Sequence, residues 1–302
     1  MRVFYLLFII TLTVSSIAQQ ADTLSILKHL EHIIDTENPR NHMYPEILDE
    51  VALYIHDELE KNCDSVAYQP YDVGGYEYRN VIGSIGLDKP NRIIIGAHYD
   101  VCGAQDGADD NASAVAGLLE LARLLKGNNL EYRLDFVAYT LEEPPYFGTK
   151  QMGSYIHAKY VHDQRIRVTG VICMDMIGYY AFERKTQTYP LWGLGLFYGT
   201  KGDYITAVKK FGPGKFAKKF AKKFKRNSAI KVKKFTGPQK LPGIGFSDHL
   251  NYWKFGYSSL FITNTGFYRN FNYHKKGDSL ATLNLPKIAE VVDGLNNALR
   301  EF

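Results

Sequence analysis

Apolar and polar residues alternate along the chain with two different periods. Apolar residues recur every three or four positions over residues 24–34 and again over 45–59, and this spacing predicts two amphipathic helices near the N-terminus. Residues 66–73 and 78–85 have the pattern of strands, and a glycine pair at 74–75 provides the turn between them. We therefore expect a pair of strands directly after the two helices.

Four short apolar runs follow, and each is typical of a strand that is covered on both faces of a sheet. They span residues 92–97, 133–140, 167–174 and 258–263. Helical periods predict further helices over residues 112–125, 151–160 and 286–300. Because helices and strands alternate, we expect a three-layer α/β/α sandwich with a mixed, mostly parallel central sheet. No repeat or long linker interrupts this order, so we expect a single domain over residues 19–302.

Residues 1–18 have the composition of a targeting segment rather than of a folded element. Met1 and Arg2 precede an apolar stretch over residues 3–14, and small residues lead up to Ala18. This order predicts a secretory signal peptide that is cut after Ala18. A membrane anchor is the alternative, but the apolar stretch is too short to span roughly 30 Å of hydrocarbon. We therefore expect a protein that is exported to the periplasm or to the extracellular space.

The composition excludes several classes of protein. Hydrophobic residues make up 45% and charged residues 23% of the 302 residues, which excludes a disordered chain and a collagen-like fibre. A chain of this length buries enough apolar surface to fold without crosslinks. The three cysteines, Cys63, Cys102 and Cys173, cannot all pair with one another, so a disulfide-built scaffold is excluded as well. One pair that includes Cys63 remains open.

Positive charge is concentrated in one part of the chain, the Lys-rich segment (residues 204–240). It contains thirteen Lys and Arg and no Asp or Glu, and without these charges the formal net charge of +4 would be −9. Phe216, Phe220 and Phe224 are spaced by four within it, which predicts an amphipathic helix. Such a helix either contacts anionic surfaces weakly through its lysines or packs its Phe stripe on the sheet. We favour packing and expect no nucleic-acid partner, because no motif of a nucleic-acid-binding fold accompanies the charge.

Polar residues collect where the expected strands end. They are His98 and Asp100 after the first buried strand, Asp109 and Asp110 in the loop that follows, Glu142 and Glu143 after the second strand, Asp175 after the third, and Tyr273 and His274 beyond the last. Ligands of open α/β sheets bind at this carboxyl edge. Several charged groups there would be costly unless a cation compensates them. Two histidines and several carboxylates, with no cysteine among them, favour zinc in an open catalytic site.

These residues could have different roles in a site that holds two metal ions. A carboxylate between two ions can bridge them, and two ions roughly 3.5–4 Å apart hold and acidify one water. Of the neighbouring Glu142 and Glu143, one can bind an ion while the other faces that water. Asp100 lies two positions after His98 on the same strand side, so its carboxylate can accept the second imidazole N–H and fix the ring.

Six motifs in a fixed order carry a resemblance to a known family. They are AHYD at residues 97–100, GADDNAS at 107–113, LEEPPYFGTKQMGS at 141–154, MDMIG at 174–178, FSDH at 246–249 and YHKKGDS at 273–279. With these motifs the chain resembles, from about residue 79 to the C-terminus, the secreted co-catalytic di-zinc aminopeptidases of metallopeptidase family M28. Glutamate carboxypeptidases and glutaminyl cyclases are relatives of that family.

The resemblance implies a set of metal ligands, carried over motif by motif. It implies that His98 and Asp175 bind one Zn²⁺, that Glu143 and His274 bind a second Zn²⁺, and that Asp110 bridges the two ions. Members of the family often have a strained peptide bond directly after the bridging aspartate, which here is Asp110.

The resemblance also implies roles for residues that do not bind the ions. Glu142 would be the general base, and Tyr273 resembles a tyrosine that donates to the developing oxyanion. We expect three further residues to orient the metal ligands by hydrogen bonds without binding the ions themselves, namely Asp100, Asp248 and Asp278.

The activity that the resemblance implies is hydrolysis of an amide bond by water held between two Zn²⁺ ions. We expect an exopeptidase that acts on peptide substrates, most simply an aminopeptidase, while carboxypeptidase and dipeptidase action are compatible with the same motifs. Two other functions stay open: a glutaminyl-peptide cyclotransferase that uses a single zinc on the same fold, and a non-catalytic binding protein of that fold. The complete set of ligand types favours the hydrolase.

The sequence departs from the family pattern beside the last of the implied ligands. Lys275 and Lys276 follow His274, where the family usually has the pattern H-T-x-x-D-T. These lysines either favour acidic substrates or face solvent, and we favour the second interpretation. Arg269 is a candidate to pair with a carboxylate of the substrate.

Overall fold

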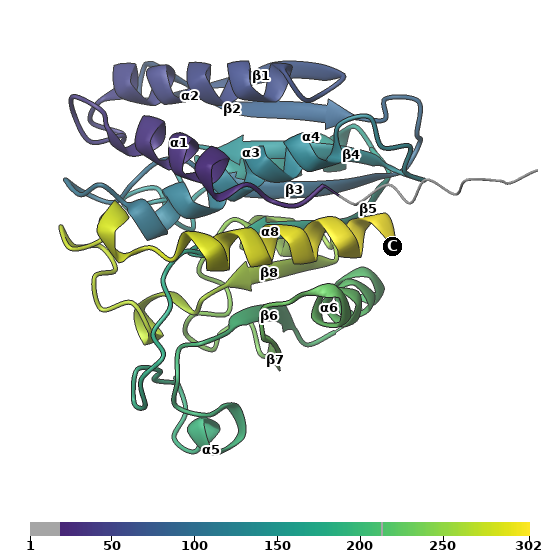
Figure 1. Cartoon of the computed structure of the whole chain (residues 1–302). Helices are drawn as coiled ribbons and strands as arrows, with labels where there is room; N and C mark the ends of the chain where they lie inside the picture. The colour runs from purple at the N-terminus through teal and green to yellow at the C-terminus, as the bar shows by residue number, and fades with distance from the viewer. Residues whose placement is uncertain (1–18, 213) are drawn as a thin grey trace, which may run out of the picture.

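The computed structural model describes residues 19–212 and 214–302, so the expected signal peptide lies outside the described residues. These residues fold around one eight-stranded sheet with the spatial order β1-β2-β4-β3-β5-β8-β6-β7 (Figure 1). The strands are β1 (Ser65–Val73), β2 (Tyr76–Ile85), β3 (Arg92–His98), β4 (Arg133–Tyr139), β5 (Val168–Met174), β6 (Ile205–Lys210), β7 (Val232–Gly237) and β8 (Ser259–Thr263). The helices are α1 (Thr23–Ile34), α2 (Pro45–Glu60), α3 (Ser113–Leu125), α4 (Gly153–Asp163), α5 (Leu194–Tyr198), α6 (Lys215–Asn227), α7 (His249–Lys254) and α8 (Leu285–Arg300).

The middle of the sheet is parallel, whereas antiparallel pairs join the strands toward its edges. β3 pairs in parallel with both β4 and β5, and β5 pairs in parallel with β8. On one side β2 joins β4 and β1 joins β2, both in antiparallel orientation. On the other side β6 joins β8 in antiparallel orientation, and β7 pairs in parallel with β6. The expected mixed, mostly parallel sheet is thereby confirmed.

Helices cover both faces of the sheet, and the apolar runs explain why. Ile93 and Ile95 of β3 belong to the large core that α1, α2, α3, α6 and α8 share, whereas Ile94 packs with Ala158 of α4 and Tyr252 of α7. Because neighbouring residues of a strand point to opposite faces, a strand covered on both sides is apolar at every position. Figure 1 shows α3 and α8 in front of the sheet.

The Lys-rich segment forms one helix that the sequence predicts and two strands that it does not. α6 buries Phe216, Phe220 and Phe224, each at most 4% exposed, while most of its lysines face solvent. The ring of Phe216 also packs against Phe302 at the C-terminus. The packing interpretation of the Phe stripe is therefore confirmed. β6 and β7 escape prediction because lysines interrupt their apolar pattern, and β7 is an edge strand, where lysine prevents pairing with other chains.

Crosslinks and membrane spans are the remaining structural expectations. Cys63, Cys102 and Cys173 carry free thiols, so the pair with Cys63 that the sequence left open does not form in the structure. Across residues 19–212 and 214–302, no helix combines the length and the apolar character that a membrane span requires.

Candidate metal centre

The parallel middle of the sheet brings the polar strand ends together. β3 ends at His98, which is aligned with Tyr139 at the end of the neighbouring β4. Glu142 and Glu143 follow β4 within a few residues, and Asp175 comes directly after β5. All of these side chains therefore start from one edge of the sheet, where parallel strands present their carboxyl ends.

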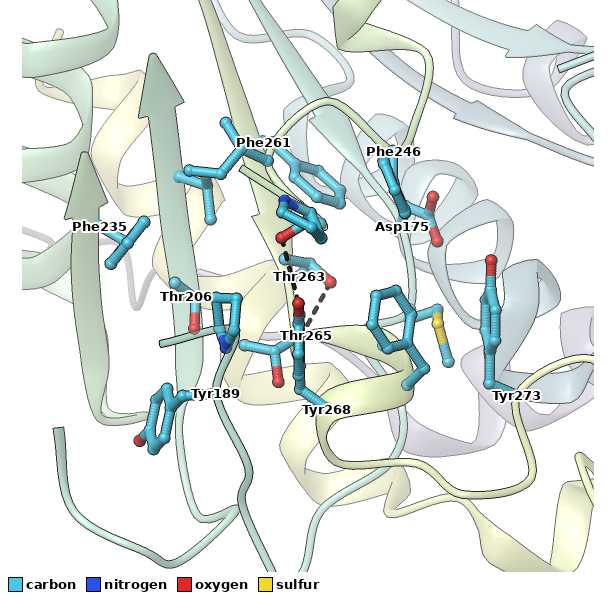
Figure 2. Close-up of a pocket in the computed structure, with 18 of the residues that line it drawn as sticks. Asp175, Tyr189, Thr206, Phe235, Phe246, Phe261, Thr263, Thr265, Tyr268 and Tyr273 are labelled. Atoms are coloured by element: carbon cyan, nitrogen blue, oxygen red, sulfur yellow. Dashed lines mark hydrogen bonds between the residues drawn. The ribbon is translucent and has the colours of Figure 1, made fainter. Parts of the chain in front are cut away.

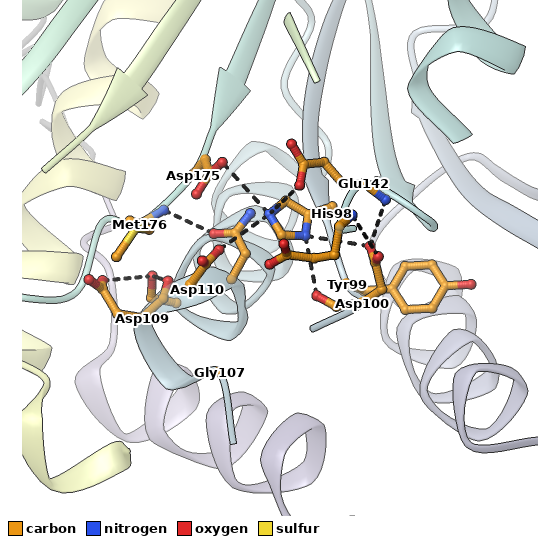
Figure 3. Close-up of polar contacts among 12 residues, drawn as sticks. His98, Tyr99, Asp100, Gly107, Asp109, Asp110, Glu142, Asp175 and Met176 are labelled. Carbon is orange, nitrogen blue, oxygen red and sulfur yellow. Dashed lines mark hydrogen bonds and ion pairs between the residues drawn. The ribbon is translucent and has the colours of Figure 1, made fainter. Parts of the chain in front are cut away.

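One half of the cluster surrounds His98 (Figure 3). Its Nε2 atom lies 3.5 Å from Oδ1 of Asp110, 3.7 Å from Oδ2 of Asp175 and 3.9 Å from Oε2 of Glu142. Asp110 comes from the short turn η1 (Ala108–Ala112) between β3 and α3. One ligand atom each of His98, Asp110 and Asp175 lie within 4.8 Å of one another, which is a spacing that can hold a metal ion.

The other half surrounds His274, in the loop between β8 and α8. Its Nε2 atom lies 3.3 Å from Oδ2 of Asp110 and 3.2 Å from Oε2 of Glu143. Asp110 thus presents one carboxylate oxygen to His274 and the other to His98. The structure brings together all five residues that the resemblance assigns to the metal ions. The peptide bond between Asp110 and Asn111 is cis, at the position where the family often has a strained bond.

Buried atoms that lack hydrogen-bond partners show that this cluster fits a cation. They are Nε2 of His98, Nε2 of His274, Oδ2 of Asp110 and Oε1 of Glu143, and within the described structure none of them forms a hydrogen bond. An unpaired buried polar group costs roughly 1–3 kcal/mol. Imidazole nitrogens and carboxylate oxygens that share one space are the donors of a catalytic zinc site.

Burial and the neighbouring ionisable groups shift the pKa values of the carboxyl groups in the cluster. Burial raises the pKa of Glu142 well above its ordinary value, although His98 acts against this shift. Burial and the neighbouring charge of Asp110 raise the pKa of Glu143 to about 7. Burial would also raise the pKa of Asp110, but His274 and His98 outweigh it and lower this pKa. A cation among these carboxylates would relieve their repulsion and stabilise their ionised forms.

Asp100 supports the backbone of the site. Its two carboxylate oxygens accept hydrogen bonds from the backbone N–H groups of Glu142 and Glu143, both at 3.1 Å. The Nδ1 atom of His98 lies 3.2 Å from the carbonyl oxygen of Asp100 and 3.5 Å from its carboxylate. Both the carbonyl and the carboxylate of Asp100 therefore lie beside the second ring nitrogen of His98, and the carbonyl is the nearer acceptor.

The two other supporting aspartates differ in their surroundings. Asp278 accepts hydrogen bonds from the backbone N–H groups of Asp109 at 2.9 Å and Asp110 at 3.0 Å, so it fixes the turn η1. Asp248 is fully buried before α7, and neither of its carboxylate oxygens has a hydrogen-bond partner in the described structure. Burial raises the pKa of Asp248 to about 7. The structure therefore gives Asp278 a supporting contact, and it gives Asp248 none.

Asp109 joins three loops, a role that the sequence did not indicate. Its Oδ1 accepts hydrogen bonds from the backbone of Gly178 at 2.8 Å and Tyr179 at 3.0 Å. Its Oδ2 accepts from the side-chain amides of Asn264 at 2.8 Å and Asn270 at 2.9 Å. The turn η1 is thus tied to the loops after β5 and β8. The Asp109-Asp110 pair was the only sequence signal, and it did not reveal that the two side chains face different partners.

Arg40 is a second supporting residue that the sequence did not reveal. Its buried guanidinium donates to the carbonyl oxygens of Tyr99 at 2.9 Å and Gly107 at 2.6 Å, and also to that of Asp106. These contacts hold the loop between β3 and η1. Arg40 lies upstream of every motif that carried the resemblance, so no sequence signal connected it with the site.

A cavity of about 320 Å³ opens beside the cluster (Figure 2). One end is formed by the cluster residues Asp110, Glu142, Glu143, Asp175 and His274, together with Tyr273. The walls are mainly aromatic and aliphatic and include Tyr189, Val208, Phe235, Leu241, Phe246, Phe261 and Phe267. Figure 2 shows Asp175 and Tyr273 at one end of the cavity and Phe235 and Tyr189 at the other. A ligand in the cavity therefore meets charge at one end and apolar surface along the rest.

Tyr273 connects the cluster with this cavity. Its ring stacks on that of His274, with 3.7 Å between the ring centroids. Burial, followed by the charges of Asp110 and Glu143, raises the pKa of Tyr273 above its ordinary value. The phenol therefore stays protonated, and it can donate a hydrogen bond to a bound molecule.

The structure shows what surrounds Arg269 and the two lysines that follow His274. Arg269 is buried and donates to the side chain of Gln187 at 2.8 Å and to the carbonyl oxygen of Tyr204 at 2.7 Å. It supports the wall of the cavity, so the expectation that it pairs with a substrate carboxylate is wrong. Lys275 and Lys276 are exposed, which agrees with the interpretation that they face solvent.

The fold and the site together describe an α/β protein with a buried carboxylate and imidazole cluster at the carboxyl edge of its sheet. The sequence profile described as Peptidase family M28 matches residues 80–299. The chain therefore belongs to peptidase family M28, and the resemblance of its motifs is confirmed.

Individual relatives and structures agree with this assignment. The chain is 35% identical over 288 residues to "Uncharacterized protein YfbL" of Escherichia coli, covering 93% of this chain and 88% of that protein. It is 26% identical over 260 residues to a "Probable leucine aminopeptidase" of Trichophyton verrucosum, covering 80% of this chain and 61% of that protein. A crystal structure of a Bacteroides thetaiotaomicron glutaminyl cyclase superposes with a TM-score of 0.70 at 20% identity, covering 94% and 99% of the two chains. At this identity the likeness concerns the fold alone.

Proposed function

We propose that this protein is a zinc-dependent exopeptidase, and specifically an aminopeptidase that removes N-terminal residues from peptides. The observation that carries the proposal is Asp110, whose two carboxylate oxygens face His98 and His274 within one buried cluster. A carboxylate between two imidazole groups suits a pair of metal ions that share one ligand. Membership in peptidase family M28 and the likeness to a probable leucine aminopeptidase support peptide hydrolysis.

The cluster divides into two proposed ion sites. His98 and Asp175 would hold one Zn²⁺, Glu143 and His274 would hold the other, and Asp110 would be shared between them, which the short distances among these side chains support. When bound, such ions supply a polarised substrate carbonyl and a water of lowered pKa. The backbone positions these proposed ligands, because the strand ends and the turn η1 fix where each side chain starts.

We assign proton transfer to Glu142. It is buried at the cavity, its carboxylate lies 3.9 Å from Nε2 of His98, and its backbone is held by Asp100. Burial raises its pKa, and a cation bound beside it would favour the ionised form that accepts a proton. Glu142 takes a proton from the attacking water and delivers it to the leaving amide nitrogen.

We assign Tyr273 to the developing negative charge on the substrate oxygen. Its hydroxyl is protonated and lies at the charged end of the cavity. A donor placed where charge develops stabilises the transition state more than the ground state. Tyr273→Phe removes this donor and keeps the ring that stacks on His274, so it separates the two contributions.

The walls of the cavity favour large apolar residues at the N-terminus of the substrate. Phe235, Phe246 and Phe261 line it beyond the cluster, and none of the Lys and Arg residues in the described part of the chain does. A side chain such as Leu, Phe or Tyr loses its water and contacts these rings, whereas a charged side chain would lose its water without compensation.

Glutaminyl cyclisation is the second candidate function, because a glutaminyl cyclase shares the fold over nearly the whole chain. A single zinc, as the family resemblance describes it, would need only one of the two groups that share Asp110. The presence of both groups, one at each carboxylate oxygen of Asp110, favours the hydrolase.

A substrate panel tests the proposal. Aminoacyl-nitroanilides, dipeptides, carboxypeptidase substrates and glutaminyl peptides are assayed with and without a metal chelator. We expect release of N-terminal apolar residues that the chelator abolishes and that added Zn²⁺ restores. Cyclisation of glutaminyl peptides without nitroaniline release would replace the aminopeptidase by the second candidate.

Export completes the proposed function. The basic start, the apolar stretch over residues 3–14 and the small residues before Ala18 support a signal peptide. Expression of the full chain with N-terminal sequencing of the secreted form should give Gln19 as the first residue. Retention of the uncleaved chain inside the cell would contradict export.

A further inference from the structure

Cys102 lies in the same side-chain cluster as two of the residues proposed to bind a metal ion. Its Sγ atom and one ligand atom each of Glu143 and His274 lie within 4.8 Å of one another. Cys102 follows His98 by four residues, is partly buried and carries a free thiol. A cysteine in this position is therefore part of the site, although its place in the sequence gave no indication of a role.

A second observation points to a ligand at the same place. Glu143 is only 4% exposed, and its Oε1 atom has no hydrogen-bond partner in the described structure. Nε2 of His274 is equally unpartnered. Donor atoms around a zinc ion lie at roughly 2.0–2.3 Å from it, so atoms with the observed spacing can converge on one ion after small side-chain movements.

We propose that Cys102 is a thiolate ligand of the ion that Glu143 and His274 hold. The inference rests on the proposed metal centre. The S–H proton leaves to solvent as the bond between sulfur and metal forms. With Asp110 this ion then has four protein ligands, whereas the ion at His98 and Asp175 has three and keeps an open position.

The two ions then differ in their number of protein ligands. The ion at His98 and Asp175 keeps an open position for water or substrate, whereas the ion at Cys102 takes part in catalysis by expanding its coordination to five. The sulfur donor also favours zinc over magnesium, calcium and manganese, which prefer oxygen ligands.

Cobalt substitution tests the inference through a spectrum rather than through activity. Co²⁺ is bound to the wild type, to Cys102→Ser and to Cys63→Ser, whose thiol lies elsewhere, beside Leu59 and Gly83. We expect a near-ultraviolet thiolate-to-cobalt charge-transfer band in the wild type and in Cys63→Ser, and its loss in Cys102→Ser. The visible cobalt bands of the remaining ligands stay in all three proteins.

The possible failures are distinguishable. Visible cobalt bands without a charge-transfer band, or a band that persists in Cys102→Ser, overturn the role of Cys102 and leave the metal centre intact. No cobalt bands in any of the three proteins overturns the metal centre as well. Alkylation of the wild type gives an independent readout: Zn²⁺ should slow modification of Cys102 by roughly tenfold or more and leave Cys63 unchanged. Equal rates with and without Zn²⁺ overturn the inference.

A different feature, the α5 tip, carries a second inference. We define the α5 tip as Leu191, Trp192, Leu196 and Phe197. Residues 186–189 and 199–202 form its stem, in which the backbone N–H groups of Thr186 and Gln187 donate to the carbonyl oxygen of Thr200 at 3.0 and 3.2 Å. Figure 1 shows α5 at the bottom of the view, set apart from the layers of the sheet.

The side chains of the α5 tip are apolar, and more than half of the surface of each is exposed. Trp192 is 99% exposed, Phe197 85%, Leu196 83% and Leu191 52%. Soluble surfaces rarely expose large apolar side chains in one group, and such groups mark interaction sites.

Basic residues outnumber acidic ones around this apolar group. Exposed basic residues flank the stem and the neighbouring edge strand β7, namely Arg184, Lys185, Lys201, Lys231 and Lys234, whereas the nearby acidic residues are Glu183, which is exposed, and Asp203, which pairs with Lys231 at 3.5 Å. The hydroxyl of Tyr198 donates to the carbonyl oxygen of Lys234 at 3.4 Å, which places β7 beside α5. Tip-to-tip contact of two copies would bring these like charges together. Apolar tips with Trp and Phe above basic residues instead match the interface of an anionic membrane.

We propose that the α5 tip inserts into the surface of an anionic lipid membrane. Trp192 reports on this directly, because the second tryptophan, Trp253, is only 5% exposed. With phosphatidylglycerol-containing vesicles we expect a blue shift of the Trp192 emission and quenching by brominated acyl chains. Neither is expected with pure phosphatidylcholine vesicles. Trp192→Phe should keep binding and lose the signal.

Variants complete the test. Combined replacement of Trp192, Leu196 and Phe197 by Ser should weaken vesicle binding by roughly tenfold or more, while Phe211→Ser, an exposed phenylalanine outside the tip, should not. Absence of vesicle binding overturns the inference. Binding that depends on the lysines of α6 and not on the tip, or self-association that depends on the tip without vesicle binding, overturns it too.

Discussion

Glu142 and Glu143 show how neighbouring residues of one type receive different positions. Both follow β4, and Asp100 holds both backbones. The carboxylate of Glu143 lies 3.2 Å from His274, that of Glu142 lies 3.9 Å from His98, and both residues line the cavity. Because the chain turns at the strand end, the two side chains serve different parts of the cluster. This agrees with the proton transfer that we propose for Glu142.

Replacement of this carboxylate tests its role. Glu142→Gln should lower kcat by about 10²–10⁴-fold, because an amide of the same size cannot accept the proton. Zinc content and unfolding free energy should stay near those of the wild type. The measurement is kcat on an aminoacyl-nitroanilide, with Glu50→Gln on the exposed face of α2 as the control. A kcat within a few-fold of the wild type would remove Glu142 from the mechanism.

At the residue scale, the motifs predicted the positions that strand ends dictate and missed those that loop conformation decides. His98 and Asp175 could be placed beforehand because parallel strands end at a common edge. The hydrogen bonds of Asp109 and Arg40 depend on how loops fold over that edge, which no spacing in the sequence encodes. For the same reason the carbonyl oxygen of Asp100, which lies 3.2 Å from Nδ1 of His98, was not expected as an additional partner of the ring.

A hydrogen-bonded chain connects elements beneath the site. The hydroxyl of Tyr252 in α7 lies 2.6 Å from that of Tyr139 in β4 and 2.6 Å from Nδ1 of His157 in α4. Burial lowers the pKa of His157 from 6.5 to about 4, although Asp135 opposes this shift. The imidazole is therefore neutral in the folded protein at pH 7 and gains its proton more readily when the chain unfolds.

This shift predicts a pH dependence of stability. The unfolded chain binds the proton of His157 below pH 6.5, so its contribution is complete above pH 6.5 and is lost as the pH falls toward 4. The loss across this window is up to roughly 3 kcal/mol. In urea unfolding at a series of pH values, His157→Gln should show a shallower decline than the wild type. His162→Gln, on the exposed side of the same helix, should decline like the wild type. Equal slopes for all three proteins would refute the assignment.

The packing of α6 makes a second prediction at the scale of elements. Phe220 is fully buried between α6 and the sheet, so Phe220→Ala should lower the free energy of unfolding by about 3–5 kcal/mol. Lys222→Ala, on the exposed face of the same helix, should change it by less than about 0.5 kcal/mol. Urea unfolding measures both. Similar small effects for the two variants would mean that α6 is attached loosely and that its lysines matter more than its phenylalanines.

At the scale of elements, the sequence predicted those whose pattern is set by burial on the sheet. The runs at 92–97 and 167–174 correspond to β3 and β5 because both strands are covered on two faces. β6 and β7 remained unpredicted because lysines within them are tolerated near the edge of the sheet. α6 was predicted because its Phe spacing survives among the charges.

In the whole molecule, distant segments form the cavity. Its walls combine residues from the loop after β5, such as Tyr189, with Phe235 of β7, Phe246 before α7 and Phe267 after β8. No motif describes such a wall, since it exists only after the chain has folded. The side-chain preference of the enzyme was therefore beyond prediction from the sequence, and the structure is what suggests it.

Substrate preference follows from these walls. We expect kcat/KM for Leu and Phe substrates to exceed that for Gly by roughly 100-fold or more, because each buried methylene contributes about 1–3 kcal/mol in an apolar pocket. Asp and Glu substrates should be poor. Phe235→Ala should raise KM for the Phe substrate more than for the Ala substrate, and Phe211→Ala outside the cavity should change neither. A preference for Gly or for acidic residues would contradict this use of the cavity.

The count of zinc ions per folded chain is the most direct test of the whole account. The purified protein is loaded with Zn²⁺, desalted and analysed for metal, beside Asp110→Asn and the exposed control Asp88→Asn. We predict about two ions per chain for the wild type and for Asp88→Asn, and a loss from both positions in Asp110→Asn, because one carboxylate serves both histidines. A wild type that holds about one ion, with the same content in Asp110→Asn, would contradict the shared-ligand centre.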